Sequence, residues 1–151
     1  MPQIKTILVP VDFSAHSRKA LDYAVHLAKT FGAEIRLLHC YQINPGSLSP
    51  YGPVLPEEFT KELRSAAQSR LEEWRDLVSR EGVVAHIELS AVFPSEAISR
   101  MAESLHADLI VIGTRGLTGL KHVLLGSVAE RTVRTAPCPV LTVKDHDAPE
   151  D

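Results

Sequence analysis

The stretch DLIVIGTRG, residues 108–116, joins the most hydrophobic run of the chain to the start of a glycine-rich loop. The part DLIVI, at 108–112, contains four consecutive apolar residues, which is typical of a strand buried on both faces of a parallel sheet. We therefore predict a central strand there. Ligands of such sheets bind beyond the carboxyl ends of the strands, so the loop from Gly113 onward is the first candidate site.

Strands and helices alternate regularly on both sides of this run. Apolar runs predict further strands at residues 4–11, 34–40, 83–89 and 139–143, and helical spacing predicts helices at 15–31, 56–80, 97–105 and 127–134. This alternation predicts an α/β fold: a single-domain, open, five-stranded parallel sheet of Rossmann-like type with helices on both faces. We expect the domain to span residues 1–144, with a polar tail at 145–151 and a Pro-, Gly- and Ser-rich loop at 45–56.

Length and composition are those of an ordinary globular domain. The 151 residues are 44% hydrophobic and 23% charged, which is enough for one buried core. The net charge of -3 provides no basic field, so we expect no nucleic-acid partner. No apolar run approaches the ~18 residues that span a bilayer, and the first residues lack the layout of a signal peptide. We therefore expect no membrane contact and a cytoplasmic location.

The cysteines and histidines give no sign of redox or metal chemistry. Cys40 and Cys138 form no Cys-x-x-Cys pair and lie in apolar runs, so we interpret both as reduced core residues. The seven histidines show no metal-ligand spacing. We expect no dedicated metal site.

The loop after the central strand has the features of an anion site. Gly113 and Gly116 allow the backbone to aim N–H groups at a phosphate, and Gly126 with Ser127 does the same from the start of a helix. The alternative interpretation is a plain turn, followed by a capping box in which Ser127 and Glu130 cap the helix. The two interpretations are compatible, and the convergence of four such residues after a central strand favours phosphate binding.

Two common nucleotide-binding classes do not fit the sequence. No stretch supplies the Gly-x4-Gly-Lys-Ser/Thr pattern of a P-loop. The end of the first strand, residues 10–14, lacks the glycines of a dinucleotide-binding Rossmann site. P-loop catalysis and NAD binding are therefore disfavoured.

The glycine pattern of residues 113–127, G-x2-G-x9-G-S, resembles the ATP-binding pattern of the universal stress protein (UspA-like) family. The resemblance covers essentially the whole chain. Three further segments agree in order and spacing, namely ILVPVDFS at 7–14, LLHC at 37–40 and the run 107–143.

The resemblance implies an adenine nucleotide site at the strand ends. Asp12 would contact the adenosine with its carboxylate, flanked by Pro10 and Val11. The backbone at Cys40 would bind the edge of the adenine ring. A pocket with apolar walls and a few polar groups suits an adenine ring. Asp12 has an alternative role, which is to help start the first helix. The residues expected around the ribose and phosphates are Gly113, Thr114, Arg115, Gly116, Gly126, Ser127 and Val128. Any Mg²⁺ would arrive with the nucleotide, since no acidic pair marks a separate cage.

These residues predict a binding protein rather than an enzyme. Near the glycine loop, His122 is the only candidate general base, and no Ser-His-Asp or Cys-His arrangement accompanies it. We expect an ATP-dependent stress-response or signalling module, and the resemblance implies a homodimer joined through the last strand, 139–143, whose open edge invites pairing. A slow ATPase or adenylyl-transferring enzyme, and a dimeric interaction module without nucleotide, remain the alternatives.

Overall fold

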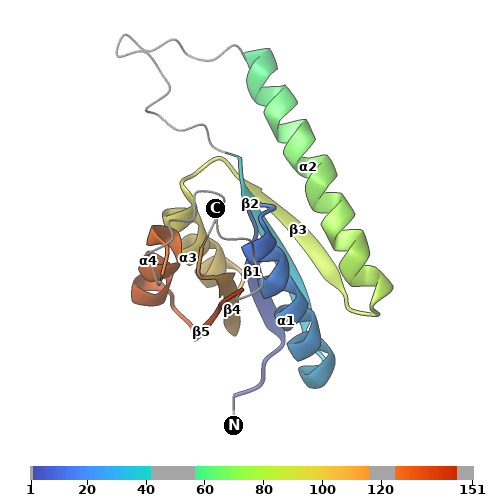
Figure 1. Cartoon of the computed structure of the whole chain (residues 1–151), viewed down its shortest axis with the longest axis vertical. Coiled ribbons are helices and arrows are strands. Elements are labelled where there is room, and N and C mark those ends of the chain that lie inside the picture. The colour runs from blue at the N-terminus through green and yellow to red at the C-terminus, as the bar shows by residue number, and fades with distance from the viewer. Residues whose placement is uncertain (1, 42–56, 116–124, 146–151) are drawn as a thin grey trace.

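A computed structural model describes residues 2–41, 57–115 and 125–145, and these form five strands and four helices (Figure 1). The strands are β1 (Thr6–Pro10), β2 (Glu34–Cys40), β3 (Ala85–Ser90), β4 (Leu109–Gly113) and β5 (Val140–Val143). The helices are α1 (Ala15–Phe31), α2 (Glu57–Arg80), α3 (Pro94–Ser104) and α4 (Ser127–Thr135). The predicted loop at 45–56, Gly116 and His122 lie outside the described residues, as does most of the predicted tail.

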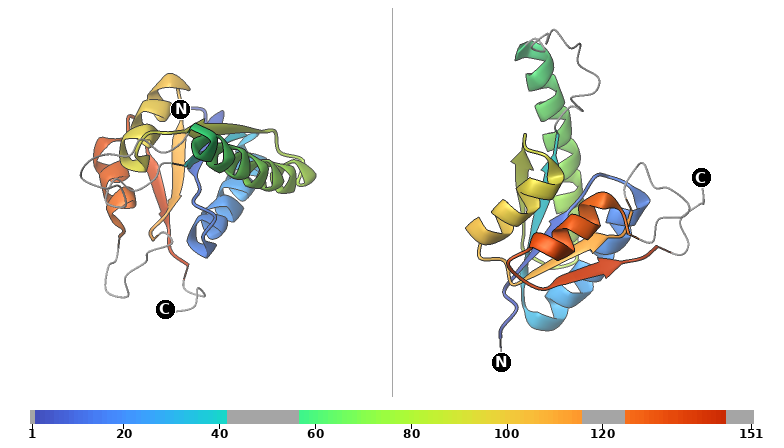
Figure 2. Two further views of the ribbon diagram at one scale, coloured as in Figure 1. Left: turned by 90° about the horizontal axis from the view of Figure 1, so that it is seen from above. Right: turned by 90° about the vertical axis from the view of Figure 1, so that its left-hand side faces the viewer.

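The strands form one parallel sheet in the order β3-β2-β1-β4-β5. Helices α1 and α2 cover one face of this sheet, and α3 and α4 cover the other (Figure 2). The strand order reverses between β1 and β4, which are neighbours at the centre of the sheet although two strands separate them in sequence. The structure thus confirms the predicted single-domain α/β fold, and it places the switch point of the sheet between β1 and β4.

The core consists of two apolar layers separated by the sheet. Alternate residues of β1 point to opposite layers, with Ile7 and Val9 on the side of α1 and α2 and Leu8 on the side of α3 and α4. Both layers contain fully buried side chains, including Ile35, Leu37, Leu71 and Val111 in the first layer and Leu38, Ile98 and Ile110 in the second. A sheet covered in this way leaves its strand ends as the exposed places for polar chemistry.

Two strands begin two residues later than the sequence predicts. β1 begins at Thr6, which is paired with Glu34, the first residue of β2, rather than at Ile4. β3 begins at Ala85, paired with Ile35, rather than at Val83. The residues just before these two strands still accept one hydrogen bond each from β2, from the Glu34 N–H to the Lys5 carbonyl and from the Ile35 N–H to the Val84 carbonyl, both at 2.9 Å, but they stand outside the strand pairing.

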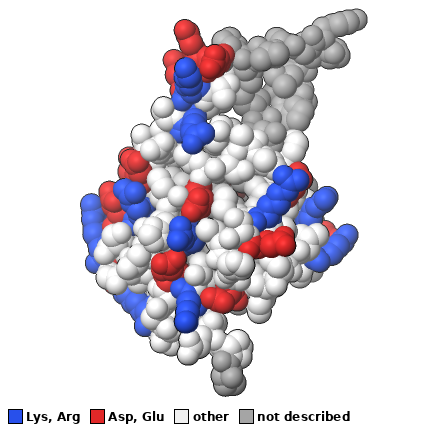
Figure 3. Space-filling model, turned by 180° about the vertical axis from the view of Figure 1, so that it is seen from behind, with Lys and Arg blue, Asp and Glu red and all other residues white. Residues whose placement is uncertain are grey.

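None of the described helices has the length and apolar character needed to cross a membrane. On the face drawn in Figure 3, the described Lys and Arg side chains are intermixed with Asp and Glu.

Candidate functional site

The carboxyl ends of β1 and β4 meet at the switch point and form the candidate site. Just past β1, the Val11 N–H donates to the Leu38 carbonyl at 2.8 Å, which keeps the chain alongside β2. Just past β4, the Thr114 N–H donates to the Val143 carbonyl at 3.1 Å. Asp12 and Thr114 therefore leave the sheet at the same edge, as the sequence predicts for residues that follow central strands.

Asp12 takes part in the turn that starts α1. The Ser14 N–H donates to Asp12 Oδ1 at 3.0 Å, and the Asp12 N–H lies 3.4 Å from Ser17 Oγ. Ser14 is the N-cap of α1, since its Oγ accepts from the Ser17 N–H at 3.1 Å. The helix-starting role of Asp12 is thus confirmed, and its role toward a nucleotide stays a prediction.

The start of α4 differs from the predicted capping box. The N-cap is Gly126, Ser127 is the first helical residue, and within the described part of the chain no side chain caps the helix. Glu130 does not reach back to the N-cap, because its carboxylate pairs with Arg134 one turn further on. The capping-box prediction is therefore wrong by one residue. The first N–H groups of a helix have no acceptor within it, so α4 presents donors and the positive end of its dipole at this point.

A backbone hydrogen bond of Gly126 connects the start of α4 to the end of β4. The Gly126 N–H donates to the Thr114 carbonyl at 2.5 Å, so this N–H is paired within the protein rather than unpaired as predicted. A Cβ on Gly126 would lie 3.0 Å from that same carbonyl oxygen. A Cβ on Gly113 would lie 2.9 Å from the carbonyl oxygen of His16 in α1. Gly113 is thus required by close backbone packing against α1, and Gly126 makes a tight approach to Thr114, whatever the two glycines contribute to a ligand.

The remaining predicted residues surround the same edge. Pro10 is the last residue of β1 and Cys40 the last of β2, while Arg115 lies half-buried after β4. Val128 packs with Cys40 against the α3–α4 layer of the core. Burial raises the pKa of the Cys40 thiol to about 11. The two cysteines do not form a disulfide with each other, and both are half-buried against the core rather than inside it as predicted.

A group of side chains beside Asp12 was not predicted. Phe13 has a positive φ of 64°, and its ring contacts those of His39 and Trp74, with centroids 4.5 and 5.2 Å away. The Arg70 guanidinium lies 4.2 Å from the centre of the Phe13 ring. The positions in sequence are too far apart for any periodicity to reveal this grouping.

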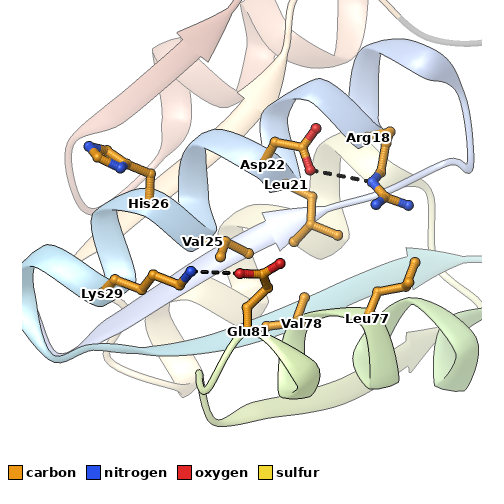
Figure 4. A pocket seen from close by; sticks show the side chains of 9 residues that line it. All are labelled: Arg18, Leu21, Asp22, Val25, His26, Lys29, Leu77, Val78 and Glu81. Atoms are coloured by element: carbon orange, nitrogen blue, oxygen red, sulfur yellow. Dashed lines mark hydrogen bonds and ion pairs between the residues drawn. The ribbon is translucent and has the colours of Figure 1, made fainter.

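A cavity of about 300 Å³ lies between α1 and α2, away from the strand ends (Figure 4). Its floor is apolar, and two ion pairs bound it, Arg18 with Asp22 at 3.4 Å and Lys29 with Glu81 at 2.6 Å. None of the residues predicted for the nucleotide lines it. It is a feature of the helical layer and not of the switch point.

Comparisons with known proteins agree with this fold. The model of the universal stress protein family matches residues 3–144. A universal stress protein of Methanocaldococcus jannaschii is 39% identical over 147 residues, which cover 93% of this chain and 82% of that protein.

Solved structures show the same fold. Universal stress protein UspA from Lactobacillus plantarum has a TM-score of 0.81 and 25% identity, with 95% of this chain and 99% of that chain covered. A universal stress protein solved in complex with cAMP has a TM-score of 0.71 and 25% identity, with 95% and 98% covered.

Proposed function

The chain belongs to the universal stress protein family, and from that membership we propose that it binds ATP or a close adenine nucleotide where β1 and β4 end. The observation that supports this most is the start of α4. That helix begins beside Thr114, and no side chain of the described residues caps it, so we expect its first N–H groups to be available to a phosphate near Asp12. A relative of the same fold was solved in complex with cAMP, which is an adenine nucleotide.

The proposed contacts divide the nucleotide between two strand ends. Pro10, Val11 and Asp12 line the adenosine half, with the backbone of Cys40 at the adenine edge. The phosphates lie against residues 113–115 and 126–128, where Arg115 offsets their charge. Any Mg²⁺ would arrive with the nucleotide; the described residues contain no group of three or more His, Cys, Asp or Glu that could hold it separately.

We also propose that two chains pair through β5. Among the described strands β5 pairs only with β4, and Leu141 on it is 37% exposed, so its outer edge can accept a second copy. In this proposal the dimer acts in the cytoplasm as a stress-response or signalling module, and the nucleotide sets the arrangement of the loop after β4.

Calorimetry with ATP, ADP, AMP and adenosine tests the site, and Ser127→Pro is the informative variant. Proline removes one N–H at a helix position that tolerates it, and Gly126 before it already has the extended conformation that precedes proline (φ -63°, ψ 160°). We expect ATP to bind about tenfold more weakly, since a charge-assisted hydrogen bond contributes roughly 1.5 kcal/mol or more. Adenosine affinity should not change.

Ser127→Ala is the matched control, because it removes the hydroxyl and keeps the N–H. Equal ATP affinities of Ser127→Pro and Ser127→Ala would exclude the α4 amide from phosphate recognition. Failure of the unmodified protein to bind ATP, ADP and AMP would defeat the proposal as a whole. Phosphate release from ATP, measured on the same samples, tests the alternative of a slow ATPase.

A further inference from the structure

Phe13 holds an unusual backbone conformation at the candidate site. Its φ of 64° lies in the left-handed region, which costs a bulky residue free energy and which glycine adopts without strain. This conformation turns the chain sharply between Asp12 and Ser14. It thereby brings the Ser14 N–H to Asp12 Oδ1 at 3.0 Å. The direction of the Asp12 carboxylate therefore depends on the backbone of Phe13.

The ring of Phe13 is held from two other elements. Trp74 of α2 meets it edge to face, with an interplanar angle of 84°, and the Arg70 guanidinium of the same helix lies over it. His39 of β2 contacts it at a tilt of 43°. The His39 ring is itself fixed, because its Nδ1 is 2.8 Å from the Val11 carbonyl, which can only accept a hydrogen bond.

We infer that Phe13 is a positioning residue of the proposed nucleotide site: its contacts with α2 and β2 offset the strain of its left-handed backbone and so keep the Asp12 carboxylate in its binding direction. This inference rests on the proposed function. A glycine at this position would allow the same turn, but it would leave the loop free to adopt others. The aromatic residue and its partners instead prepare one conformation before the nucleotide binds.

Replacing Phe13 by alanine and by glycine separates positioning from simple packing. Phe13→Ala keeps the left-handed strain and loses the ring, so most molecules leave the binding conformation and ATP affinity falls about tenfold. Phe13→Gly also loses the ring but has no strain, so its ATP affinity stays within about threefold of the unmodified protein. If Phe13 served packing alone, glycine would bind ATP no better than alanine, and that result would overturn the inference.

Arg70→Gln tests the contribution of the α2 contact to holding the Phe13 ring. It removes the cation over the Phe13 ring from an exposed position, and we expect ATP to bind about threefold more weakly. In the Phe13→Gly background the same change should have no further effect, since no ring remains to be held. Arg75→Gln is the matched control, because it makes the same charge change on α2 at a residue whose partner is Asp76. Equal losses with and without the Phe13 ring would overturn the coupling.

Hydrogen exchange of the Ser14 amide keeps this test independent of nucleotide binding. That amide donates to Asp12 Oδ1, so it should exchange about tenfold faster in Phe13→Ala than in Phe13→Gly. Should the protein bind no adenine nucleotide, the proposed function fails while this measurement still decides the positioning role.

His106, exposed at the opposite end of the sheet with a φ of 51°, gives the control. His106→Gly should leave Ser14 exchange and ATP affinity unchanged, and equal exchange in the two Phe13 variants would overturn the inference.

Discussion

Gly113→Ala should destabilise the fold even without any ligand. The new Cβ would lie 2.9, 3.0 and 3.2 Å from the carbonyl oxygen, carbonyl carbon and Cβ of His16, whereas carbon atoms in contact are ordinarily 3.5–4.0 Å apart. To relieve this clash with His16, α1 has to move by about half an ångström. That movement is opposed because α1 is packed against the sheet through buried Ala20 and Ala24. Overpacking of this kind costs about 1–3 kcal/mol. We expect about 2 kcal/mol, which lowers Tm by roughly 4–8 °C in a domain of this size.

Urea unfolding followed by circular dichroism measures this effect, and Gly32 provides the control. Gly32 has a φ of 69° and nothing within 4 Å of an added Cβ, so its substitution is costly through backbone strain alone. Asparagine tolerates that conformation, so Gly32→Asn should be less destabilising than Gly32→Ala. At Gly113 the order should reverse, because the larger side chain meets the same backbone atoms of α1.

The outcome separates packing from phosphate binding at Gly113. If the free energy of unfolding of Gly113→Ala lies within about 0.5 kcal/mol of that of the unmodified protein, the steric reasoning is refuted, since substitutions at exposed surface positions stay in that range. A Gly113→Asn variant as stable as Gly113→Ala would refute it as well. In that case the close approach to His16 is relieved without cost in stability. Any loss of ATP affinity in the variant would then come from a changed contact with the nucleotide and not from a destabilised fold.

Two further predictions follow from burial near the strand ends. Burial lowers the pKa of His39, against the opposing effects of the Val11 carbonyl and Asp12, so the unfolded chain binds the proton more readily. The free energy of unfolding should therefore fall as the pH drops through about 6.5, the ordinary pKa of histidine. In the His39→Gln variant, the urea-unfolding midpoint should depend less on pH between pH 5 and 7.5. If the midpoint of the variant depends on pH as steeply as that of the unmodified protein, His39 is excluded as the cause. The pKa of about 11 for Cys40 keeps its thiol protonated, so Ellman's reagent at pH 7.5 should modify it at least a hundredfold more slowly than free cysteine. Rapid modification of the folded protein would contradict this.

The fold could be predicted because its signals are local. The run at 108–112 and the other apolar runs identified the strands, and the alternation with helices indicated a parallel sheet. The starts of β1 and β3 were placed two residues too early, since the residues before Thr6 and Ala85 have suitable side chains but stand outside the strand pairing. Strand length is a property of a pair, and one sequence run contains only half of that information.

The site could be predicted only in outline. Topology alone places the residues after β1 and β4 at one edge, so the sequence could bring Asp12 and Thr114 together there. The N-cap of α4 was misplaced because Ser127 and Glu130 fit the spacing of a capping box, whereas Gly126 is fixed by Thr114, twelve residues earlier. The strain at Phe13 depends on rings from α2 and β2, and no spacing in the sequence encodes those contacts.

Thr114 joins two elements that have different proposed tasks. Its N–H is bonded to Val143, the last residue of β5, and its carbonyl accepts from Gly126 at the start of α4. With a side chain that is 3% exposed, this residue has little room to move alone. If a phosphate binds at the start of α4 as proposed, we expect a shift of Gly126 to act through Thr114 on Val143, the last residue of β5.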